Sequence, residues 1–527
     1  MKPPPISHKA LLAFVTTLTL ALVGVPVAIH QLGADTPERT SGTDLLAAAG
    51  AAQWQQEPSA EDLLKAGNTA GRAEQFYFVL PDRFANGDKR NDTGGLTGDR
   101  LTTGLDPKDK GFYHGGDLKG VINQLDYIQG LGTTAIWMAP IFKNRPVQGT
   151  GADVSAGYHG YWITDFTQVD PHFGTNEELK KLVSLAHQRG IKVYLDIIVN
   201  HTADVIKYAE DKYGYVDKKT APYKDSQGRA FEDRNYADGT RDFPDVNEKS
   251  FPYTPTFANA ADAKVKVPAW LNDPTMYHNR GDSTFAGENS EYGDFFGLDD
   301  LWTERPEVVH GLTDIYGQWI GRAGVDGFRL DTVKHANLEF WPQFTRGIEK
   351  AAEQAGKKDF FMFGEVYSAD QEIESTYVRR GGLPATLDFS FQEAARGYTA
   401  ADGSAKSLAD LYARDDLYAA RDTDASRLTT FLGNHDMGRI GSFIAATGGD
   451  DATELRRVQL AHQLMFLTRG QPVVYSGDEQ GFTGPGGDKD ARQDMFASQV
   501  PDYLDDDLIG TTRTHASDQY DKNHPLY

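Results

Sequence analysis

Eight short apolar runs alternate with helix-like stretches along most of this chain. The runs lie at residues 76–80, 135–138, 193–199, 325–330, 360–366, 386–391, 428–432 and 473–475. Residues 175–189, with Thr175 at the expected N-cap, and residues 306–323 have the periodicity of amphipathic helices. Strands that alternate with helices favour an α/β fold with a parallel sheet, and eight of them favour a closed (β/α)8 TIM barrel.

Acidic residues follow several of these runs. The pattern occurs at residues 327–331 (Gly-Phe-Arg-Leu-Asp), 193–201, 360–366 and 430–436. Reactive groups in such barrels lie at the carboxyl ends of the strands, so we expect these acids around one catalytic mouth. Arg329 and Asp331 are two positions apart on a strand and therefore point to the same side. The guanidinium is expected to hold the Asp331 carboxylate ionised and aimed.

The segment 202–305 is too long for a simple strand-to-helix loop. It is polar and rich in Tyr, Asp and Gly. A structureless loop of this length is uncommon in a compact domain. We therefore predict an inserted subdomain after the third strand, with the barrel formed by residues 73–201 and 306–527.

The beginning of the chain predicts export. A basic start precedes an apolar run at residues 10–29. Residues 1–30 are therefore expected to be a secretory signal peptide, and the protein to be extracellular. An uncleaved membrane anchor over residues 10–29 is the alternative. Residues 31–72 are interpreted as a linker or N-terminal extension.

The composition excludes several kinds of partner and site. The formal net charge of −23 disfavours nucleic acid and anionic membranes, and it is compatible with a neutral substrate and bound cations. The chain has no cysteine, which excludes disulfides, thiolate metal sites and cysteine nucleophiles.

Seven segments together carry a family resemblance. They are 134–140 (TAIWMAP), 157–162 (GYHGYW), 196–201 (DIIVNH), 327–335 (GFRLDTVKH), 363–366 (FGEV), 431–436 (FLGNHD) and 470–479 (GQPVVYSGDE). In this order they resemble the α-amylase family of glycoside hydrolases, over roughly residues 75–520. The family implies a TIM barrel with a variable domain after the third strand. Members usually continue into an all-β domain, and we find no such C-terminal β-domain in this sequence.

The resemblance implies a retaining mechanism with three acids. Asp331 would be the nucleophile, Glu365 the general acid/base, and Asp436 a third carboxylate that binds sugar hydroxyls. Apolar neighbours at 361–366 and converging negative charges would favour the protonated form of Glu365. Taken alone, Arg329 and Asp331 could instead be a buried structural ion pair, and Glu365 a solvent-facing acid.

The resemblance also assigns contacts with the substrate. His201 and His435 would hydrogen-bond the sugar beside the cleaved bond. Tyr161 would stack on that ring and His159 would contact it. Lys334 would lie near the leaving group, and Arg329 belongs to the same substrate-binding group. Considered singly, the histidines and Tyr161 could be core residues, and Lys334 a solvated charge.

Two calcium sites are expected from the resemblance. The first would use Asn200, Asp300 and the backbone carbonyl of His335, and would pin the inserted subdomain to the barrel. The ligands of the second would be Asn86, Asp88, Asn91, Asp92, Gly115 and Asp117. An ordinary polar turn is the alternative reading of this second cluster. No His-rich cluster has the spacing typical of zinc ligands.

The leading functional hypothesis is an endo-acting α-glucan hydrolase that cleaves internal α-1,4 bonds of starch-like polysaccharides through a covalent glycosyl-enzyme intermediate. A pullulanase-like α-1,6 debranching enzyme and a cyclodextrin-type glucanotransferase are alternatives, because the choice depends on the shape of the subsites in residues 202–305 and around 367–385, which the sequence does not give. A non-catalytic carbohydrate-binding member is disfavoured, because Asp331, Glu365 and Asp436 are all present. We expect an α-glucan as partner, no nucleic acid, no obligate protein partner and a monomer.

Overall fold

The computed structural model describes residues 74–420 and 423–527. The expectations for residues 1–30 and 31–72 lie outside this range. Within the described ranges, no helix combines the length and apolar character needed to cross a membrane.

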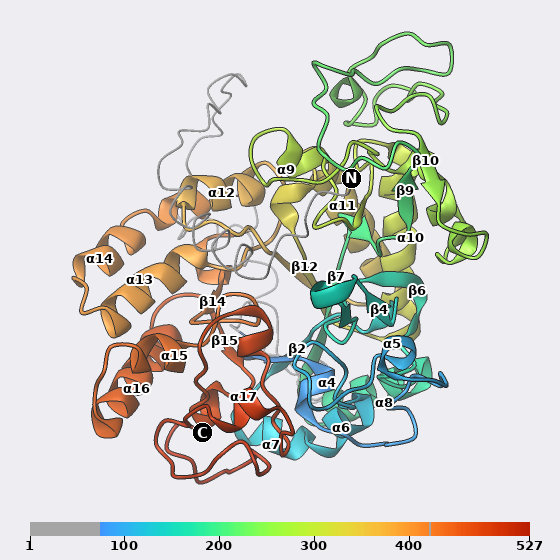
Figure 1. Ribbon diagram of the computed structural model, residues 1–527. Coiled ribbons are helices and arrows are strands. Elements are labelled where there is room, and N and C mark those ends of the chain that lie inside the picture. The colour runs from blue at the N-terminus through green and yellow to red at the C-terminus, as the bar shows by residue number, and fades with distance from the viewer. Residues whose placement is uncertain (1–73, 421–422) are drawn as a thin grey trace.

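A parallel sheet forms the centre of the molecule (Figure 1). Its order is β13-β12-β7-β2-β1-β15-β14. The strands are β1 (Phe76–Val79), β2 (Ala135–Met138), β7 (Lys192–Ile197), β12 (Gly327–Leu330), β13 (Phe361–Gly364), β14 (Thr429–Phe431) and β15 (Gln471–Tyr475). Thr386 bridges Gly364 and Leu387 bridges Thr429, both in parallel register, so these two residues link β13 to β14. The expected TIM barrel is confirmed.

The sixth apolar run is mostly helix, so the strand expected over residues 386–391 is wrong beyond its first two residues. Helix α13 (Phe389–Ala400) begins three residues into the run. The side chain of Asp388 accepts a hydrogen bond from the backbone N–H of Phe391 and caps the helix. Apolar and polar residues alternate in this segment as they do in a strand, so the sequence did not indicate the cap.

Helices surround the sheet. They are α6 (Leu118–Asn123), α7 (Leu125–Gly130), α8 (Asn176–His187), α10 (Pro306–Ala323), α11 (Phe340–Gln354), α12 (Gln371–Arg379), α14 (Lys406–Tyr412), α15 (Ile440–Ala445) and α16 (Asp451–Leu467), together with α13. Thr175 caps α8 in a reciprocal pair with Glu178, as its sequence predicts. Helix α10 covers the predicted residues and has Pro306 in its first turn.

Aromatic rings fill the interior of the barrel. Phe78 stacks on Trp137 with ring centroids 3.9 Å apart, and Phe76 meets Phe363 edge-on at 5.3 Å. The indole N–H of Trp137 donates to Asp196 at 3.1 Å. The packed interior therefore supports a polar layer at the carboxyl ends of the strands.

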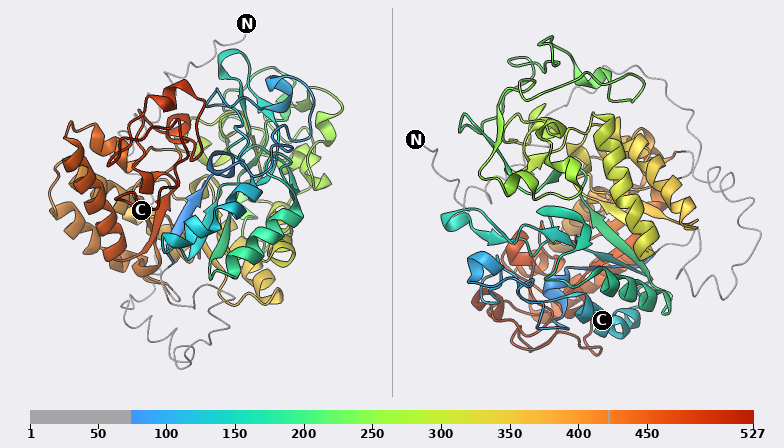
Figure 2. Two further views of the ribbon diagram at one scale, coloured as in Figure 1. Left: turned by 90° about the horizontal axis from the view of Figure 1, so that it is seen from below. Right: turned by 90° about the vertical axis from the view of Figure 1, so that its right-hand side faces the viewer.

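An inserted subdomain follows the third barrel strand, as expected. It projects from one side of the barrel (Figures 1 and 2). Two short antiparallel pairs organise it: β8 (His201–Thr202) with β11 (Asp299–Asp300), and β9 (Ile206–Tyr208) with β10 (Pro255–Phe257). Because β8 lies only a few residues after β7, the subdomain is attached directly at the catalytic end of the barrel.

The helical shell has an opening beside β15. Among the described residues after β15, the longest α-helix is α17 (Pro501–Leu504). A cavity of about 480 Å³ lies between α16, β1, β15 and residues 525–527. Phe466 and Leu467, at the end of α16, are 39% and 81% exposed.

Candidate active site

Three carboxylates meet at one guanidinium. The Nη1 atom of Arg329 lies 2.6 Å from Asp331 Oδ1 and 2.8 Å from Asp196 Oδ1, and its Nη2 atom lies 2.9 Å from Glu365 Oε1. Strand register explains the meeting, because Arg329 is paired with Asp196 on β7 and with Phe363 on β13. Asp331 and Glu365 follow the ends of β12 and β13 directly.

Arg329 was expected to hold the Asp331 carboxylate ionised and aimed, and the structure shows that Asp196 and Glu365 share this guanidinium. Burial raises the pKa of Asp331 well above its ordinary value; Arg329 opposes this shift, and the carboxylates of Glu365 and Asp196 add to it. Burial also raises the pKa of Asp196, to about 6. One guanidinium compensates three buried carboxylates only in part, which favours retention of a proton by the group. The site can therefore offer a carboxylate and a proton together.

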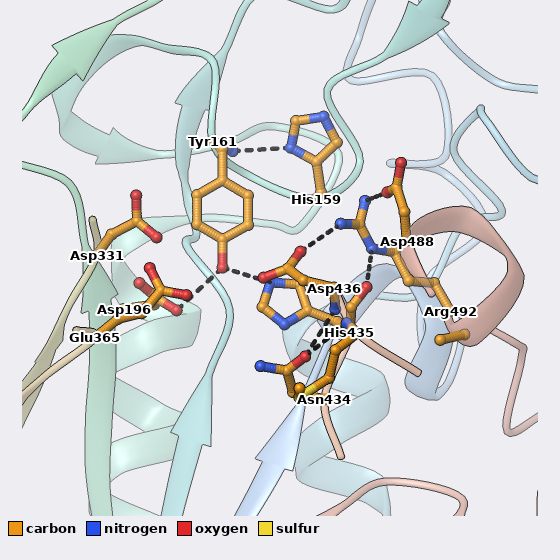
Figure 3. Close-up of polar contacts among 12 residues, drawn as sticks. His159, Tyr161, Asp196, Asp331, Glu365, Asn434, His435, Asp436, Asp488 and Arg492 are labelled. Carbon is orange, nitrogen blue, oxygen red and sulfur yellow. Dashed lines mark hydrogen bonds and ion pairs between the residues drawn. The ribbon is translucent and has the colours of Figure 1, made fainter. Parts of the chain in front are cut away.

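Tyr161 connects this group to a second cluster (Figure 3). Its hydroxyl lies 3.2 Å from Asp196 Oδ2 and 2.8 Å from His435 Nε2. His435 Nε2 is in turn 3.5 Å from Asp436 Oδ2. The backbone N–H of Tyr161 donates to His159 Nδ1 at 3.1 Å. The three predicted acids thus belong to one continuous polar network.

The exposure of the acids differs across the network. The side chains of Asp331 and Glu365 are each 8% exposed, whereas that of Asp436 is 38% exposed. Figure 3 shows Asp331 and Glu365 on one side of the Tyr161 ring and Asp436 on the other. The less exposed pair therefore has the drier surroundings that acid/base chemistry favours.

The histidines of the site are neutral. Burial lowers the pKa of His201 to about 3, and it lowers the pKa of His159 and of His435 well below the usual range. His201 Nε2 and His435 Nδ1 are buried and form no hydrogen bond to any residue that the structure describes. These atoms can therefore serve a polar ligand such as a sugar hydroxyl. Lys334 Nζ donates to the carbonyl of Tyr367 at 2.8 Å.

The sequence did not single out Arg492 and Asp488, which lie beside Asp436 in the network. The guanidinium of Arg492 lies 3.0 Å from Asp436 Oδ1 and 2.8 Å from Asp488 Oδ1, and its Nε donates to the carbonyl of His435 at 3.0 Å. Arg492 and Asp488 lie in the glycine-rich segment after β15, whose sequence has neither strand nor helix periodicity. Asp196, the acid of the run at 193–201, lies at the mouth where the pattern of strand-end acids placed it, although the sequence assigned it no role of its own.

The residues expected at the first calcium site lie next to one another. The pairing of β8 with β11 places His201 opposite Asp300, and Asn200 precedes it. Burial raises the pKa of Asp300 to about 7 and that of Asp294 to about 8, with negative neighbours adding to both shifts. The imidazole of His335 contacts the carbonyl of Ser290 at 2.7 Å. Asp294, which the sequence did not single out, is a further buried carboxylate in this electronegative region.

Part of the second calcium cluster also converges. Asn86 Nδ2 donates to Asp92 Oδ1 at 2.8 Å. Asn86 Oδ1 and Asn91 Oδ1 are buried and accept no hydrogen bond from the described part of the chain. A Cβ atom on Gly115 would lie 2.6 Å from Asn86 Nδ2 and 2.9 Å from Asp92 Oδ1, so the Gly115 backbone lies against both side chains. Two orphaned oxygens beside a carboxylate fit a hard cation.

Asp117 and Asp88 have other contacts. Asp117 caps α6 and accepts backbone hydrogen bonds from Gly87, Asp88 and Gly120 at 2.6–3.0 Å. The Asp88 carboxylate pairs with Arg90 at the surface. Asp117 Oδ2 also accepts a hydrogen bond from Asn91 Nδ2 at 3.2 Å, so the Asp117 carboxylate lies beside one of the two amide groups with an orphaned oxygen.

Known proteins resemble this chain along most of its length. The sequence model of the alpha amylase catalytic domain matches residues 78–518. An alpha-amylase of Streptomyces lividans is 58% identical over 483 residues, which are 90% of this chain and 52% of that protein. A cyclomaltodextrin glucanotransferase of Klebsiella oxytoca is 30% identical over 77% of this chain and 58% of its own length.

Solved structures agree with the sequence relatives. An α-amylase from Geobacillus thermoleovorans, crystallised with acarbose, has a TM-score of 0.57 and 32% identity over 80% of this chain and 73% of that one. The chain spans about half the length of its Streptomyces relative. The matched residues include the catalytic-site acids described above and all the barrel strands except the first two residues of β1, and the chain belongs to the α-amylase family.

Proposed function

We propose that this protein is a retaining, endo-acting hydrolase of internal α-1,4-glucosidic bonds in starch-like polysaccharides. The observation that carries the proposal is the meeting of Asp331 and Glu365 at one guanidinium, with Asp436 in the same network. Cleavage with retention needs one ionised and one protonated carboxyl, and three acids around one cation supply both. The Streptomyces relative supports the α-1,4 assignment.

The proposed reaction has two steps. Asp331 attacks the anomeric carbon while Glu365 gives its proton to the departing glycosidic oxygen, so that the C–O bond breaks and a glycosyl ester forms. Glu365 then removes a proton from water, the resulting oxygen attacks the same carbon, and the Asp331 carboxylate leaves. Arg329 keeps both carboxyl groups in place throughout.

The rest of the network would bind the sugar. Asp436 and the unpartnered nitrogens of His201 and His435 suit hydroxyl groups, and the Tyr161 ring offers a face for stacking. Arg492 fixes Asp436 through an ion pair at 3.0 Å. Sugar contacts that strengthen as the ring distorts would favour the transition state.

Product analysis tests the proposed specificity. Soluble starch should give a mixture of linear maltooligosaccharides from the earliest time points, and pullulan should release no maltotriose. Asp331→Asn protein serves as the control for contaminating activity. Maltotriose from pullulan would establish α-1,6 cleavage instead, and cyclic products from starch would establish a glucanotransferase, the activity named for the Klebsiella relative.

We also propose that Ca²⁺ binds at both expected sites. Asn86, Asn91, Asp92 and the Gly115 backbone would hold one ion, and the supporting observation is the pair of orphaned amide oxygens. At the other site, the ligands would be Asn200, Asp300, the His335 carbonyl and Asp294. An ion there would join segments before and after the inserted subdomain.

Calcium removal should lower the melting temperature. Free calcium at about 100 times Kd stabilises a folded protein by about 2.7 kcal/mol, and a chelator removes this term. The measurement is calorimetry of chelator-treated protein, followed by return of calcium alone. Asp92→Asn should reduce the calcium-dependent shift, whereas Asp99→Asn, which alters a helix cap elsewhere, should not. Identical melting curves with and without calcium would refute both sites.

Two further properties are proposed from the sequence. The protein is exported with removal of its first residues, because a basic start precedes an apolar run. It acts as a monomer on its α-glucan. N-terminal sequencing of protein from the culture medium, and light scattering of the same sample, test these proposals; an intact Met1 or a dimer mass would contradict them.

A further inference from the structure

Three metal-binding side chains meet in the inserted subdomain, outside the catalytic network. Asp233 begins η2 (Asp233–Asn235), His278 follows η5 (Pro274–Met276), and Glu304 lies just before α10. One ligand atom from each lies within 4.8 Å of the other two. The three residues are 0%, 0% and 1% exposed. We propose that they form a structural site for a divalent transition metal ion, and that zinc fits it best.

The surroundings of His278 favour metal ligation. Its Nδ1 lies 2.6 Å from Asp300 Oδ2, and its Nε2 lies 3.0 Å from Glu304 Oε2. Histidines that bind metals commonly donate their other ring N–H to a carboxylate, which is the role that Asp300 takes here. Ligands of a tetrahedral zinc ion are about 3.3 Å apart when the bonds are about 2.0–2.1 Å long. His278 and Glu304 already have nearly this spacing.

Glu304 provides an independent indication. Its Oε1 atom is buried and forms no hydrogen bond of ordinary geometry to a described residue. The Tyr292 hydroxyl is its polar neighbour. The other oxygen, Oε2, lies 3.0 Å from His278 Nε2, so the carboxylate points into the cluster. A buried carboxylate oxygen in this state suits a bound cation.

The carboxylates of the cluster carry more negative charge than Lys218 compensates, which favours a bound divalent ion. Lys218 Nζ lies 2.8 Å from Asp233 Oδ1 and compensates one carboxylate. The carboxylates of Glu304 and Asp300 remain, and both are buried against the His278 ring. The alternative is that a protonated His278 bridges these two carboxylates without metal. One imidazole and two carboxylates match zinc better than calcium, which prefers an all-oxygen shell.

The site would be structural, because all three side chains are closed off from solvent. An ion there would connect residue 233, residue 278 and the start of α10. The expected consequence is therefore resistance to unfolding of the inserted subdomain, not a change in chemistry. Through Asp300, the zinc site would also adjoin one of the proposed calcium sites.

The test is metal analysis of the full chain, purified without a polyhistidine tag. Chelator-treated protein is dialysed into excess calcium, which fills calcium sites, and is then titrated with zinc sulfate. Elemental analysis should find one tightly held zinc per chain, and Co²⁺ in its place should give the visible absorption of a low-symmetry site. Glu304→Gln should weaken zinc binding by at least about tenfold. Glu374→Gln, which changes a buried acid elsewhere, should bind zinc normally.

The outcomes separate metal from protonated histidine. If wild-type protein holds no more zinc than Glu304→Gln, or if cobalt gives only the spectrum of the hydrated ion, the site does not exist. Asp233→Asn replaces Glu304→Gln if the latter fails to fold, and it should show the same loss. Zinc binding that both variants retain would place the ion elsewhere and would also overturn the proposal.

Discussion

Asp331→Asn is expected to reduce kcat on soluble starch by about 10⁴-fold or more, while the protein stays folded. An amide has nearly the shape of a carboxylate but cannot form the glycosyl ester, so the first step is lost. Its carbonyl oxygen can still accept the hydrogen bond of Arg329, which spans 2.6 Å in the native protein. Reducing-sugar release measures the activity, and circular dichroism verifies the fold.

The matched control for this variant lies at the other end of the same strand. Asp326 precedes β12, is buried, and pairs with His187 and Lys357 at 2.6 Å each. Asp326→Asn should lower stability and leave kcat within a few-fold of the native value, because residues at the bottom of the barrel support the fold rather than the chemistry. Equal activity in Asp331→Asn and native protein would remove Asp331 from the mechanism.

Arg329→Met is expected to abolish activity and to lower the free energy of unfolding by about 3–5 kcal/mol. The substitution removes the one cation shared by Asp331, Asp196 and Glu365, and the variant must bury their carboxyl groups without it. Urea denaturation at neutral pH measures the loss. Lys192→Met, which breaks a single buried pair with Glu74 at 2.8 Å, is the control and should cost less.

The stability loss in Arg329→Met should depend on pH. Burial already raises the folded-state pKa of Asp331 and of Asp196 above the unfolded values, and without Arg329 both rise further. A group with a raised folded pKa contributes its stability below the unfolded pKa and loses it as pH rises through the folded pKa. The difference between variant and native protein should therefore shrink as pH falls from about 8 to about 5. A deficit that grows on acidification would contradict this reading of the site.

Local sequence patterns predicted much of the barrel. The bounds of α10 and the cap of α8 follow from proline, threonine and glutamate at defined helix positions. Apolar runs located the strands because strands inside a barrel are buried on both faces. The strand expected at 386–391 was wrong because Asp388 caps a helix within a segment where apolar and polar residues alternate. The choice between strand and helix in this segment depends on tertiary contacts.

The candidate site was predictable where an acid directly follows a strand. Asp331 and Glu365 were found this way, because parallel strands place their carboxyl ends together. The sharing of Arg329 with Asp196 could not be read from the chain, since it depends on the register between β7 and β12. Arg492 pairs with Asp436 from a segment whose apolar residues have no regular spacing, and no local sequence pattern predicts such a contact.

The residues expected or proposed to bind metals also differ in how far the sequence alone indicates them. Asn86, Asn91 and Asp92 could be grouped because they are close in the sequence and share one turn; that they bind calcium stays a prediction. Asp117 is the N-cap of α6, a role for which aspartate is suited, and its place among the expected calcium ligands stays a prediction. Asp233, His278 and Glu304 come from distant segments, so their meeting required the folded subdomain.

Trapping of the covalent intermediate tests the central claim most directly. Glu365→Gln protein, mixed briefly with a fluorinated maltosyl fluoride whose leaving group needs no acid, should accumulate a glycosyl ester. Peptide mass spectrometry should place the added sugar on Asp331. A sugar attached to Asp196 or Asp436, or release of the inverted anomer with no adduct in this variant or in native protein, would contradict the assignment of Asp331 as nucleophile beside Glu365.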